Sequence, residues 1–206
     1  MTSSKGKKCK NCRELFAPYN SLQKYCFKSE CVSVWTKIEN EKQWKKRKQT
    51  MSIDAHSQKH KLTLQKEINK LARMIDEHCK YTTCIDCGKE LDYEKQVDGS
   101  HRHNVQGNEN IRFNLLNIHS ARSECNQFHG GRKESYIKGL IQRYNESIAE
   151  EIENLSKQYP LSNFSNKEIF ESIAIVRKCQ RELKDYPNNN AYILRVTFNK
   201  KIGLYK

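Results

Sequence analysis

Apolar residues recur with a helical period in the first half of the chain. No glycine or proline occurs between Pro18 and Gly88, and residues of high helix propensity dominate 32–78. Four apolar residues at i, i+4, i+7 and i+11 share one helix face: Leu64, Ile68, Leu71 and Ile75. The preceding stretch, 39–61, is too polar to be buried, so it predicts an exposed helix. A break near 51–56 is left open.

The helical period returns near the C-terminus, where it predicts two amphipathic helices over 135–159 and 166–186. Ser165 or Asn166 is expected to cap the second helix, and the prolines at 160 and 187 to act as stops. One face of this helix carries four residues: Ile169, Ile173, Val176 and Cys179. Cys179 is therefore interpreted as a small core residue. The tail over 187–206 predicts a loop and an edge strand at 193–198.

The composition limits the size of any single core. The chain has 206 residues, of which 36% are hydrophobic and 30% are charged. Small metal-stabilised modules with solvated helices are favoured over one large apolar core. We therefore expect an α+β fold, predominantly helical, with a small N-terminal zinc ribbon, a long basic helix, a zinc-stabilised ββα-metal core and C-terminal helices. The expected boundaries are 1–31, 32–78, 79–135, 136–186 and a tail over 187–206.

Positive charge is concentrated in the N-terminal part of the chain. The formal net charge is +14; residues 1–50 carry 13 Lys/Arg against 4 Asp/Glu, whereas residues 81–135 carry 7 against 8. This division favours phosphate binding by the first part and cation coordination by the second. The expected nucleic-acid contacts lie on the basic helix, interleaved with Trp35 and Trp44. They are Lys42, Lys45, Lys46, Arg47 and Lys48. A merely solvated helix face is the alternative.

The chain shows no signal for export or membrane insertion. No apolar run approaches the roughly 18–20 residues of a membrane span, and residues 1–8 lack a hydrophobic signal region. We therefore expect a cytoplasmic protein with no membrane partner. Because disulfides are rare in a reducing cytosol, the nine cysteines, most of them clustered, favour metal ligation.

The first cysteine cluster predicts a structural zinc ion. Cys9 and Cys12 form one pair, Cys26 and Cys31 a second, and thirteen residues separate the pairs. Each short spacing lets two thiolates face the same tetrahedral ion, as in zinc ribbons and treble clefs. Without a metal, little else in this region would hold it folded.

The stretch from 84 to 132 has the layout of an HNH-type ββα-metal nuclease. A Cys84/Cys87 pair precedes an Asp/His cluster, and the later Cys125 is followed directly by Asn126. The cluster lies on an expected first strand over 97–103, the second strand is expected near 117–119, and a helix is expected to resume at Cys125 or shortly after. In such sites a structural zinc ion holds the fold and a second divalent ion sits where the phosphodiester is cut.

Phosphodiester hydrolysis needs an activated water, a neutralised phosphate and a stabilised leaving oxygen. We expect His101 to be the general base, because an imidazole accepts protons near neutral pH. Asp98 and Asn126 are expected to hold Mg²⁺ or another divalent ion, Asn117 to orient the base, and Arg112 to contact phosphate. Three further histidines are the alternatives for the base: His103, His119 and His129.

These motifs together resemble the NinG (Rap) recombination proteins of lambdoid phages. The resemblance covers about residues 7–186. The runs that carry it, beyond the cysteine pairs, are Asp98…His101, Arg112-Phe113-Asn114, Asn117-Ile118-His119 and Cys125-Asn126-Gln127. It implies a phage accessory protein of the host bacterial cytoplasm. The implied activity is a structure-specific DNA endonuclease that acts on branched recombination intermediates such as Holliday junctions and D-loops.

The chain departs from the family pattern at one position. The family has a second Cys-x2-Cys pair after Asn-Ile-His, but Arg122 stands where its first cysteine is expected. Two zinc ions are still expected, but the second has three cysteine ligands: Cys84, Cys87 and Cys125. Cys79 is the first candidate for its fourth ligand, and His119 is the other.

The sequence leaves three functions to be separated. The first is the nuclease, which acts on branched or duplex DNA and for which a homodimer is plausible because junction resolution often needs two active sites. The second is a non-catalytic zinc-dependent DNA-binding recombination accessory protein, which the Arg122 departure favours. The third is a zinc-bound scaffold that recruits a host recombination protein.

Overall fold

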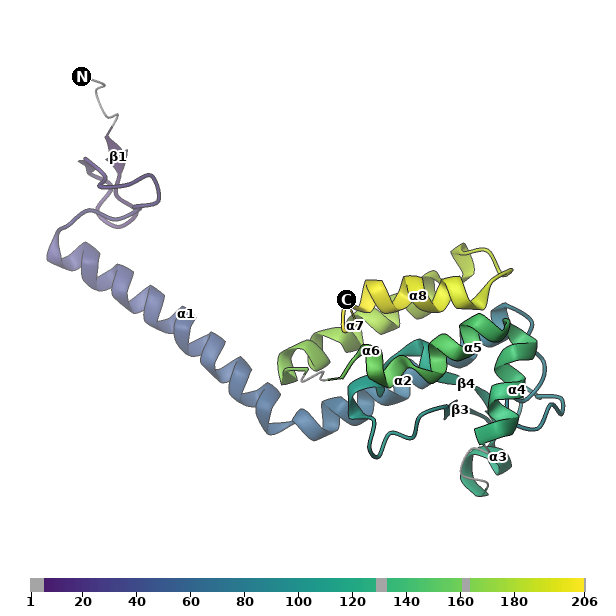
Figure 1. The fold of residues 1–206 in the computed structure, drawn as a ribbon. Coiled ribbons are helices and arrows are strands. Elements are labelled where there is room, and N and C mark those ends of the chain that lie inside the picture. The colour runs from purple at the N-terminus through teal and green to yellow at the C-terminus, as the bar shows by residue number, and fades with distance from the viewer. Residues whose placement is uncertain (1–5, 129–132, 161–163, 206) are drawn as a thin grey trace. The chain divides into compact units, whose positions relative to one another are not determined.

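A computed structural model describes residues 6–128, 133–160 and 164–205 (Figure 1). The chain divides into two compact units, Met1–Ala55 and His56–Lys206. The dividing point lies at the break that the sequence left open near 51–56. The segment 32–78, expected as one region, is therefore shared between the two units.

The first unit contains a small sheet and one long helix. Strand β1 (Lys7–Lys8) pairs antiparallel with β2 (Leu15–Phe16), and helix α1 spans Ser29–Ala55. Cys31 is the only buried residue of α1. The prediction of an exposed polar helix is confirmed over 39–55, where the side chains lack the apolar stripe that would bury a face.

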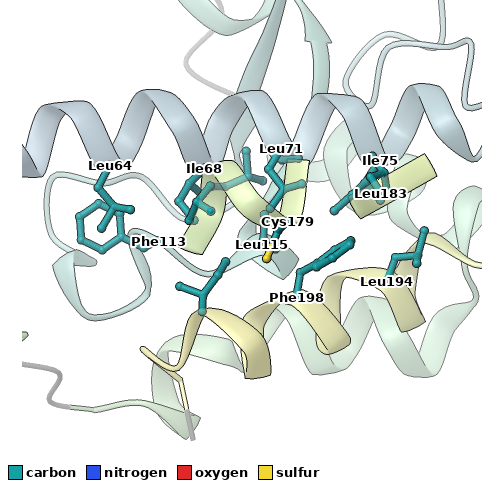
Figure 2. Packing of buried hydrophobic residues seen from close by; sticks show 14 of the residues in the cluster. Leu64, Ile68, Leu71, Ile75, Phe113, Leu115, Cys179, Leu183, Leu194 and Phe198 are labelled. Atoms are coloured by element: carbon teal, nitrogen blue, oxygen red, sulfur yellow. The ribbon is translucent and has the colours of Figure 1, made fainter. Parts of the chain in front are cut away.

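Helix α2 (Ser57–His78) is the central element of the second unit. Its apolar positions Leu64, Ile68, Leu71 and Ile75 are fully buried, as their spacing predicted. Figure 2 shows these side chains directed at Phe113, Leu115 and the residues of the C-terminal helices, which form one core cluster with them. Cys179 lies in this core and is confirmed as a packing residue.

A two-stranded sheet and a short helix follow α2 in the chain. Strand β3 (Val97–His101) pairs antiparallel with β4 (Ile118–Arg122), with Val97 opposite Arg122 and His101 opposite Ile118. Two 3₁₀ turns, η1 (Glu109–Ile111) and η2 (Leu115–Asn117), lie between the strands, and α3 (Ser123–Phe128) follows them. The expected short strand near 84–93 is reduced to one isolated bridge between Thr83 and Glu90.

The helix expected over 135–159 is three shorter helices. They are α4 (Lys133–Arg143), α5 (Glu146–Glu153) and α6 (Leu155–Gln158). The side chain of Asn145 accepts a hydrogen bond from the backbone of Ile148 and so starts a new helix where one continuous helix was predicted. Helix α7 (Asn166–Glu182) begins with a capping box between Ser165 and Glu168 and continues as η3 (Leu183–Asp185).

The prediction of an edge strand at 193–198 is wrong, because this segment belongs to helix α8 (Ala191–Ile202). The Asn190 side chain caps its first turn, and Gly203 ends it in the left-handed conformation, with φ 78°. One face carries four buried apolar residues: Ala191, Leu194, Phe198 and Ile202. None of the helices in the described ranges has the length and apolarity that a membrane crossing requires.

A buried ionic network joins α8 to the rest of the second unit. Arg195 Nη2 lies 2.5 Å from Asp76 Oδ1, and Arg143 Nη1 lies 3.0 Å from Asp76 Oδ2. Arg195 also donates to the backbone carbonyls of Leu115 and Ile118. Although burial raises the pKa of Asp76, the two guanidinium groups outweigh it and hold the pKa well below its usual range.

Candidate metal centres

The structure brings the first four cysteines together, as their spacing predicted. The sulfur atoms of Cys9, Cys12, Cys26 and Cys31 all lie within 4.8 Å of one another. Cys12 Sγ and Cys26 Sγ are 3.7 Å apart. A tetrahedral zinc ion with Zn–S bonds of about 2.3 Å separates its sulfur ligands by roughly 3.8 Å. The four thiols therefore fit a zinc ion.

Hydrogen bonds to sulfur prepare this cluster for a cation. The backbone N–H of Cys26 donates to Cys9 Sγ at 3.3 Å, and Asn11 Nδ2 donates to Cys31 Sγ at 3.4 Å. Burial raises the pKa of Cys9, but backbone hydrogen bonds from Cys26, Cys12 and Asn11 outweigh it and lower the pKa to about 6. A backbone hydrogen bond at Lys28 lowers the pKa of Cys26, but burial and the neighbouring thiols outweigh it and raise that pKa to about 12, so Cys9 is the thiol that releases its proton first. A zinc ion would replace the remaining protons.

A second group contains three cysteines, Cys84, Cys87 and Cys125, whose sulfur atoms also lie within 4.8 Å of one another. Burial and the neighbouring thiols of Cys87 and Cys84 raise the pKa of Cys125 to about 12. Although burial raises the pKa of Cys87, a backbone hydrogen bond at Lys89 and the thiols of Cys125 and Cys84 outweigh it and lower that pKa. Three sulfur donors so close together fit a soft divalent metal. The backbone N–H of Arg122 donates to Cys84 Sγ at 3.3 Å.

Neither expected fourth ligand lies with these three thiols. Cys79 packs against the core of α2, α7 and α8, where burial raises the pKa of its thiol. His119 is buried, and its two ring nitrogens lie 3.1 Å from the hydroxyls of Tyr136 and Tyr144. Both predictions for the fourth ligand are therefore corrected. The backbone of Arg122 is next to the cluster, but an arginine side chain offers no atom that binds a metal ion.

Asp98 and Asn126, the expected ligands of the catalytic ion, lie side by side. Asn126 Nδ2 is 3.2 Å from Asp98 Oδ2, across the step from β3 to α3. Both residues line a groove of about 640 Å³ that also reaches Asn69 of α2. In this arrangement the amide nitrogen faces Asp98, so a cation would require the amide to turn and present its oxygen. A carboxylate and an amide oxygen suit Mg²⁺.

The same groove contains cations that the sequence interpretation missed. Lys66, Lys70 and Arg73 of α2 line it beside Asp98. They occur at i, i+4 and i+7, on a different helix face from the buried apolar residues, and this spacing was a readable signal. Arg73 Nη1 donates to the backbone carbonyl of Val97 at 2.6 Å, which joins α2 to β3. We call this set of residues, with Asp98, Asn69 and Asn126, the α2–β3 groove.

His101 does not share a strand face with Asp98. Side chains three residues apart on a strand point to opposite sides, and His101 Nε2 lies 3.2 Å from Gln65 Nε2 on α2. Gln65 in turn donates to Asn69 Oδ1 at 2.7 Å, so His101 connects to the α2–β3 groove through two amide side chains. Burial lowers the pKa of His101 to about 4, which keeps its ring neutral at physiological pH.

Asn117 and Arg112 are both engaged by the protein. The buried Asn117 side chain accepts from the backbone N–H of His103 at 2.8 Å and donates to its carbonyl at 3.2 Å. It therefore braces the chain after β3 at His103 rather than the His101 ring. Arg112 donates to Gln65 Oε1 at 2.8 Å and pairs with Glu109 at 2.9 Å. His103 Nε2 lies 2.9 Å from the carbonyl oxygen of Ile152, and His129 lies outside the described residues.

The expected basic helix is present in the first unit as part of α1. Its cations are exposed: Lys42, Lys45, Lys46, Arg47 and Lys48. Lys42 pairs with Glu39 at 2.7 Å, one helical turn away. The exposure fits a phosphate-binding surface, and it equally fits the alternative of a solvated helix face.

Comparison with known proteins places the chain in a family. The family model described as the bacteriophage lambda NinG protein matches residues 1–187. The chain belongs to the NinG family. The protein ninG of Escherichia phage 933W is 27% identical over 204 residues, covering 90% of this chain and 96% of that protein. The protein ninG of Escherichia phage lambda is 28% identical over 209 residues, covering 90% and 95%. No solved structure matches the chain at a significant level.

Membership of the NinG family confirms the resemblance drawn from the motifs. The matched range contains both cysteine clusters and the α2–β3 groove, but it ends before α8. Arg195, which pairs with the buried Asp76, therefore lies outside the range that the NinG family model matches.

Proposed function

We propose that this NinG-family protein is a metal-dependent DNA endonuclease that cuts branched recombination intermediates such as Holliday junctions and D-loops. The observation that carries the proposal is the meeting of Asp98 and Asn126 in a groove edged by Lys66, Lys70 and Arg73. The Asp98 carboxylate, and the Asn126 oxygen once its amide turns, would bind a hard cation beside side chains whose positive charge suits a phosphodiester backbone.

Each part of the site has a proposed task. Asp98 and Asn126 would hold Mg²⁺ or a similar ion, which supplies charge neutralisation at the phosphate and the departing oxygen. The lysines of α2 would hold the flanking backbone. Zinc at the four-cysteine cluster would keep the first module folded, and zinc at Cys84, Cys87 and Cys125 would fix the local geometry of a region that its apolar core already holds.

His101 remains the proposed general base. Its ring is neutral at physiological pH, although the pKa of about 4 makes it a weaker base than an ordinary imidazole. A Gln65–Asn69 chain of hydrogen bonds leads from it to the α2–β3 groove. Its position on the strand face opposite Asp98 is the observation that speaks against this role. Reaching a water near Asp98 would require the ring to leave Gln65.

That observation favours a second candidate function, a non-catalytic zinc-dependent DNA-binding protein. In this case the groove and α1 would bind branched DNA in the host cytoplasm, with or without a host recombination partner. The His101 ring would then serve only to join β3 to Gln65 on α2.

A cleavage assay on a synthetic four-way junction, with linear duplex as the control substrate, separates the two functions. The nuclease predicts Mg²⁺-dependent cuts in the junction. Asp98→Ala should abolish them, with partial recovery at high metal concentration, whereas Asp92→Ala, which alters an exposed carboxylate paired with Lys95, should cut normally. His101→Ala should slow cleavage by roughly 10²–10⁴-fold with junction binding retained.

Two results would overturn these assignments. If the wild-type protein binds junctions but never cuts with any divalent ion, the binding protein is the correct function. If His101→Ala cuts at the wild-type rate while His103→Ala does not, the base has been assigned to the wrong histidine.

The basic surface of α1 is tested by affinity rather than cleavage. Replacing Lys45, Lys46, Arg47 and Lys48 with alanine should lower the slope of log K against log salt by up to about 0.9 for each phosphate that the variant no longer binds. An unchanged slope would identify this face of α1 as solvated only.

A further inference from the structure

The first unit exposes several large apolar side chains. Tyr19 keeps 89% of its surface exposed, Phe27 72% and Trp35 48%. Leu22 and Val32 are exposed as well. A unit with so small a core would gain stability by burying these side chains. Clusters of exposed apolar side chains mark interaction sites in soluble proteins.

These side chains surround one groove of about 900 Å³. The loop between β2 and α1 forms one wall, with Tyr19, Tyr25 and Phe27. The start of α1 forms the other, where Val32, Trp35 and Ile38 recur every three residues and so face one way. We call this set the aromatic groove. Cys26 also lines it, so a metal in the four-cysteine cluster would hold the loop wall in place.

Three lysines line the same groove: Lys10, Lys24 and Lys42. The backbone N–H of Lys10 donates to the carbonyl of Lys24 at 2.9 Å, which keeps these two residues adjacent. Within the described ranges, Lys42 forms an ion pair with Glu39, whereas Lys10 and Lys24 form none. Residues 1–55 carry 13 Lys/Arg against 5 Asp/Glu, so the whole unit attracts anions.

We propose that the aromatic groove binds unpaired bases of single-stranded DNA, stacked on Trp35, Phe27 and Tyr19, with Lys10 and Lys24 on the backbone. The inference deepens the proposed function and rests on it, because branched DNA presents bases that a continuous duplex hides. Every base offers a flat π face, and each phosphate offers a negative charge, which matches the two components of this surface.

Charge complementarity decides between this occupant and a protein segment. An apolar peptide would use the aromatic walls but would gain nothing from the lysines, and a second copy of the chain would bring another strongly basic unit to the same place. The B-form duplex keeps its base faces stacked inside. Single-stranded DNA uses both the rings and the charges.

The test measures binding of a short oligothymidylate to the zinc-loaded full chain by the change in tryptophan fluorescence. The chain has two tryptophans, so Trp44→Phe leaves Trp35 as the only tryptophan reporter. Stacking should quench Trp35. Trp35→Ala should weaken binding by about 5- to 150-fold, the range for one stacked base, while the slope of affinity against salt stays unchanged because every lysine remains in place.

Three controls isolate stacking from folding and charge. Trp44→Ala removes an aromatic residue of the same helix that is 61% exposed and does not line the groove, so affinity should be unchanged. Trp35→Phe keeps a ring and should retain most binding. An abasic oligomer of equal charge should bind the wild-type protein and Trp35→Ala equally. Zinc content should be the same in all variants.

The proposal fails if Trp35→Ala binds the oligothymidylate as the wild-type protein does, or if Trp35 is not quenched. It also fails if Trp35→Ala instead abolishes a self-association seen in sedimentation, since the groove would then hold a second copy. If the protein cleaves junctions but Trp35→Ala does not alter oligothymidylate binding, the proposal for the aromatic groove is refuted and the nuclease proposal is not. Oligothymidylate binding through Trp35 without cleavage would refute the nuclease alone.

Discussion

The two cysteine clusters differ in what surrounds them. In the first, Cys9, Cys26 and Cys31 are themselves the buried core, and among the described residues the hydrophobic side chains that pack against them are those of Cys12, Phe16 and Tyr25. In the second, Cys84 and Cys125 belong to a larger apolar cluster that includes Ile85, Ile111, Leu116, Tyr136 and Leu140. The first cluster has four thiols and little else, and the second has three thiols with a packed core behind them.

This difference indicates how each region is stabilised. A module whose core consists of thiols that could bind a metal would gain most of its folding free energy from that metal, because few apolar side chains are removed from water. A region with buried aliphatic and aromatic residues keeps most of its stability without metal. The missing fourth ligand at Arg122 is tolerable for this reason.

The largest expected effect is the loss of the first module on removal of a zinc ligand. Cys12→Ser and Cys87→Ser are matched, because each removes the second cysteine of a Cys-x2-Cys pair. Structural zinc contributes about 10–16 kcal/mol in small modules. Cys12→Ser should therefore unfold residues 7–31, seen as reduced NMR dispersion and rapid proteolysis. Cys87→Ser should leave 56–206 folded. A structured, zinc-free first module would contradict this contrast between the clusters.

Asp76→Ala should produce the next largest effect, and only in the second unit. It leaves Arg195 fully buried without its carboxylate partner, which typically costs about 3–5 kcal/mol. Urea denaturation of 56–206 followed by circular dichroism measures the change in stability. Glu171→Ala, which breaks an exposed pair with Lys167, is the control and should cost no more than about 0.5 kcal/mol. Equal effects of the two variants would show that the ionic network does not stabilise the core.

Arg122→Cys should make the second cluster resemble the first, because it would then contain four cysteines. The backbone of residue 122 already donates to Cys84 Sγ, so a thiol at this position borders the three sulfurs. Groups outside the ligand shell alter metal affinity by about 10–100-fold, so a fourth direct ligand should raise zinc affinity at least about tenfold. Cobalt substitution should show stronger sulfur-to-metal charge transfer in the variant. Unchanged affinity and spectrum would mean that the position is not part of the coordination shell.

The smallest expected effect is a pH dependence confined to the second unit. Burial, and then Arg195, lower the pKa of His119 well below its usual value. Below about pH 6.5 His119 binds a proton in the unfolded chain but not in the folded protein. The free energy of unfolding therefore falls as the pH falls. Urea denaturation between pH 7 and pH 5 should show this loss of stability. His101, whose pKa burial lowers to about 4, contributes in the same direction. His119→Gln should therefore reduce the slope without abolishing it, and an equally steep curve would assign the dependence to His101 and other groups.

Much of the fold and of the metal chemistry could be predicted from local spacing. The cysteine pairs predicted which thiols meet, because short spacings bring two sulfurs to one ion whatever surrounds them. The period of Leu64, Ile68, Leu71 and Ile75 predicted the buried face of α2, and Ser165 with Glu168 predicted the start of α7. The helical period and the cap act within a few turns of chain, and each short cysteine spacing acts within one loop.

The remaining features depend on contacts between residues that lie far apart in the sequence. The helical period at Ala191, Leu194, Phe198 and Ile202 was present but competed with β-branched neighbours, and burial against the core decided for the helix. Arg195 meets Asp76 across 119 positions. His101 and Asp98 were separated by the pleat of β3, and Lys66 and Lys70 joined Asp98 through the packing of α2 on that strand.

The sequence by itself thus indicated which cysteines could share a metal ion, where helix α7 is capped and which positions of α2 are buried. The tertiary structure alone decided which of them face one another. Ligand type and helical period are properties of neighbouring residues, and a single sequence carries them. The partners of Arg195, His101 and Asp98 depend on how α2, β3 and α8 pack, and the energy of that packing is shared among many distant side chains.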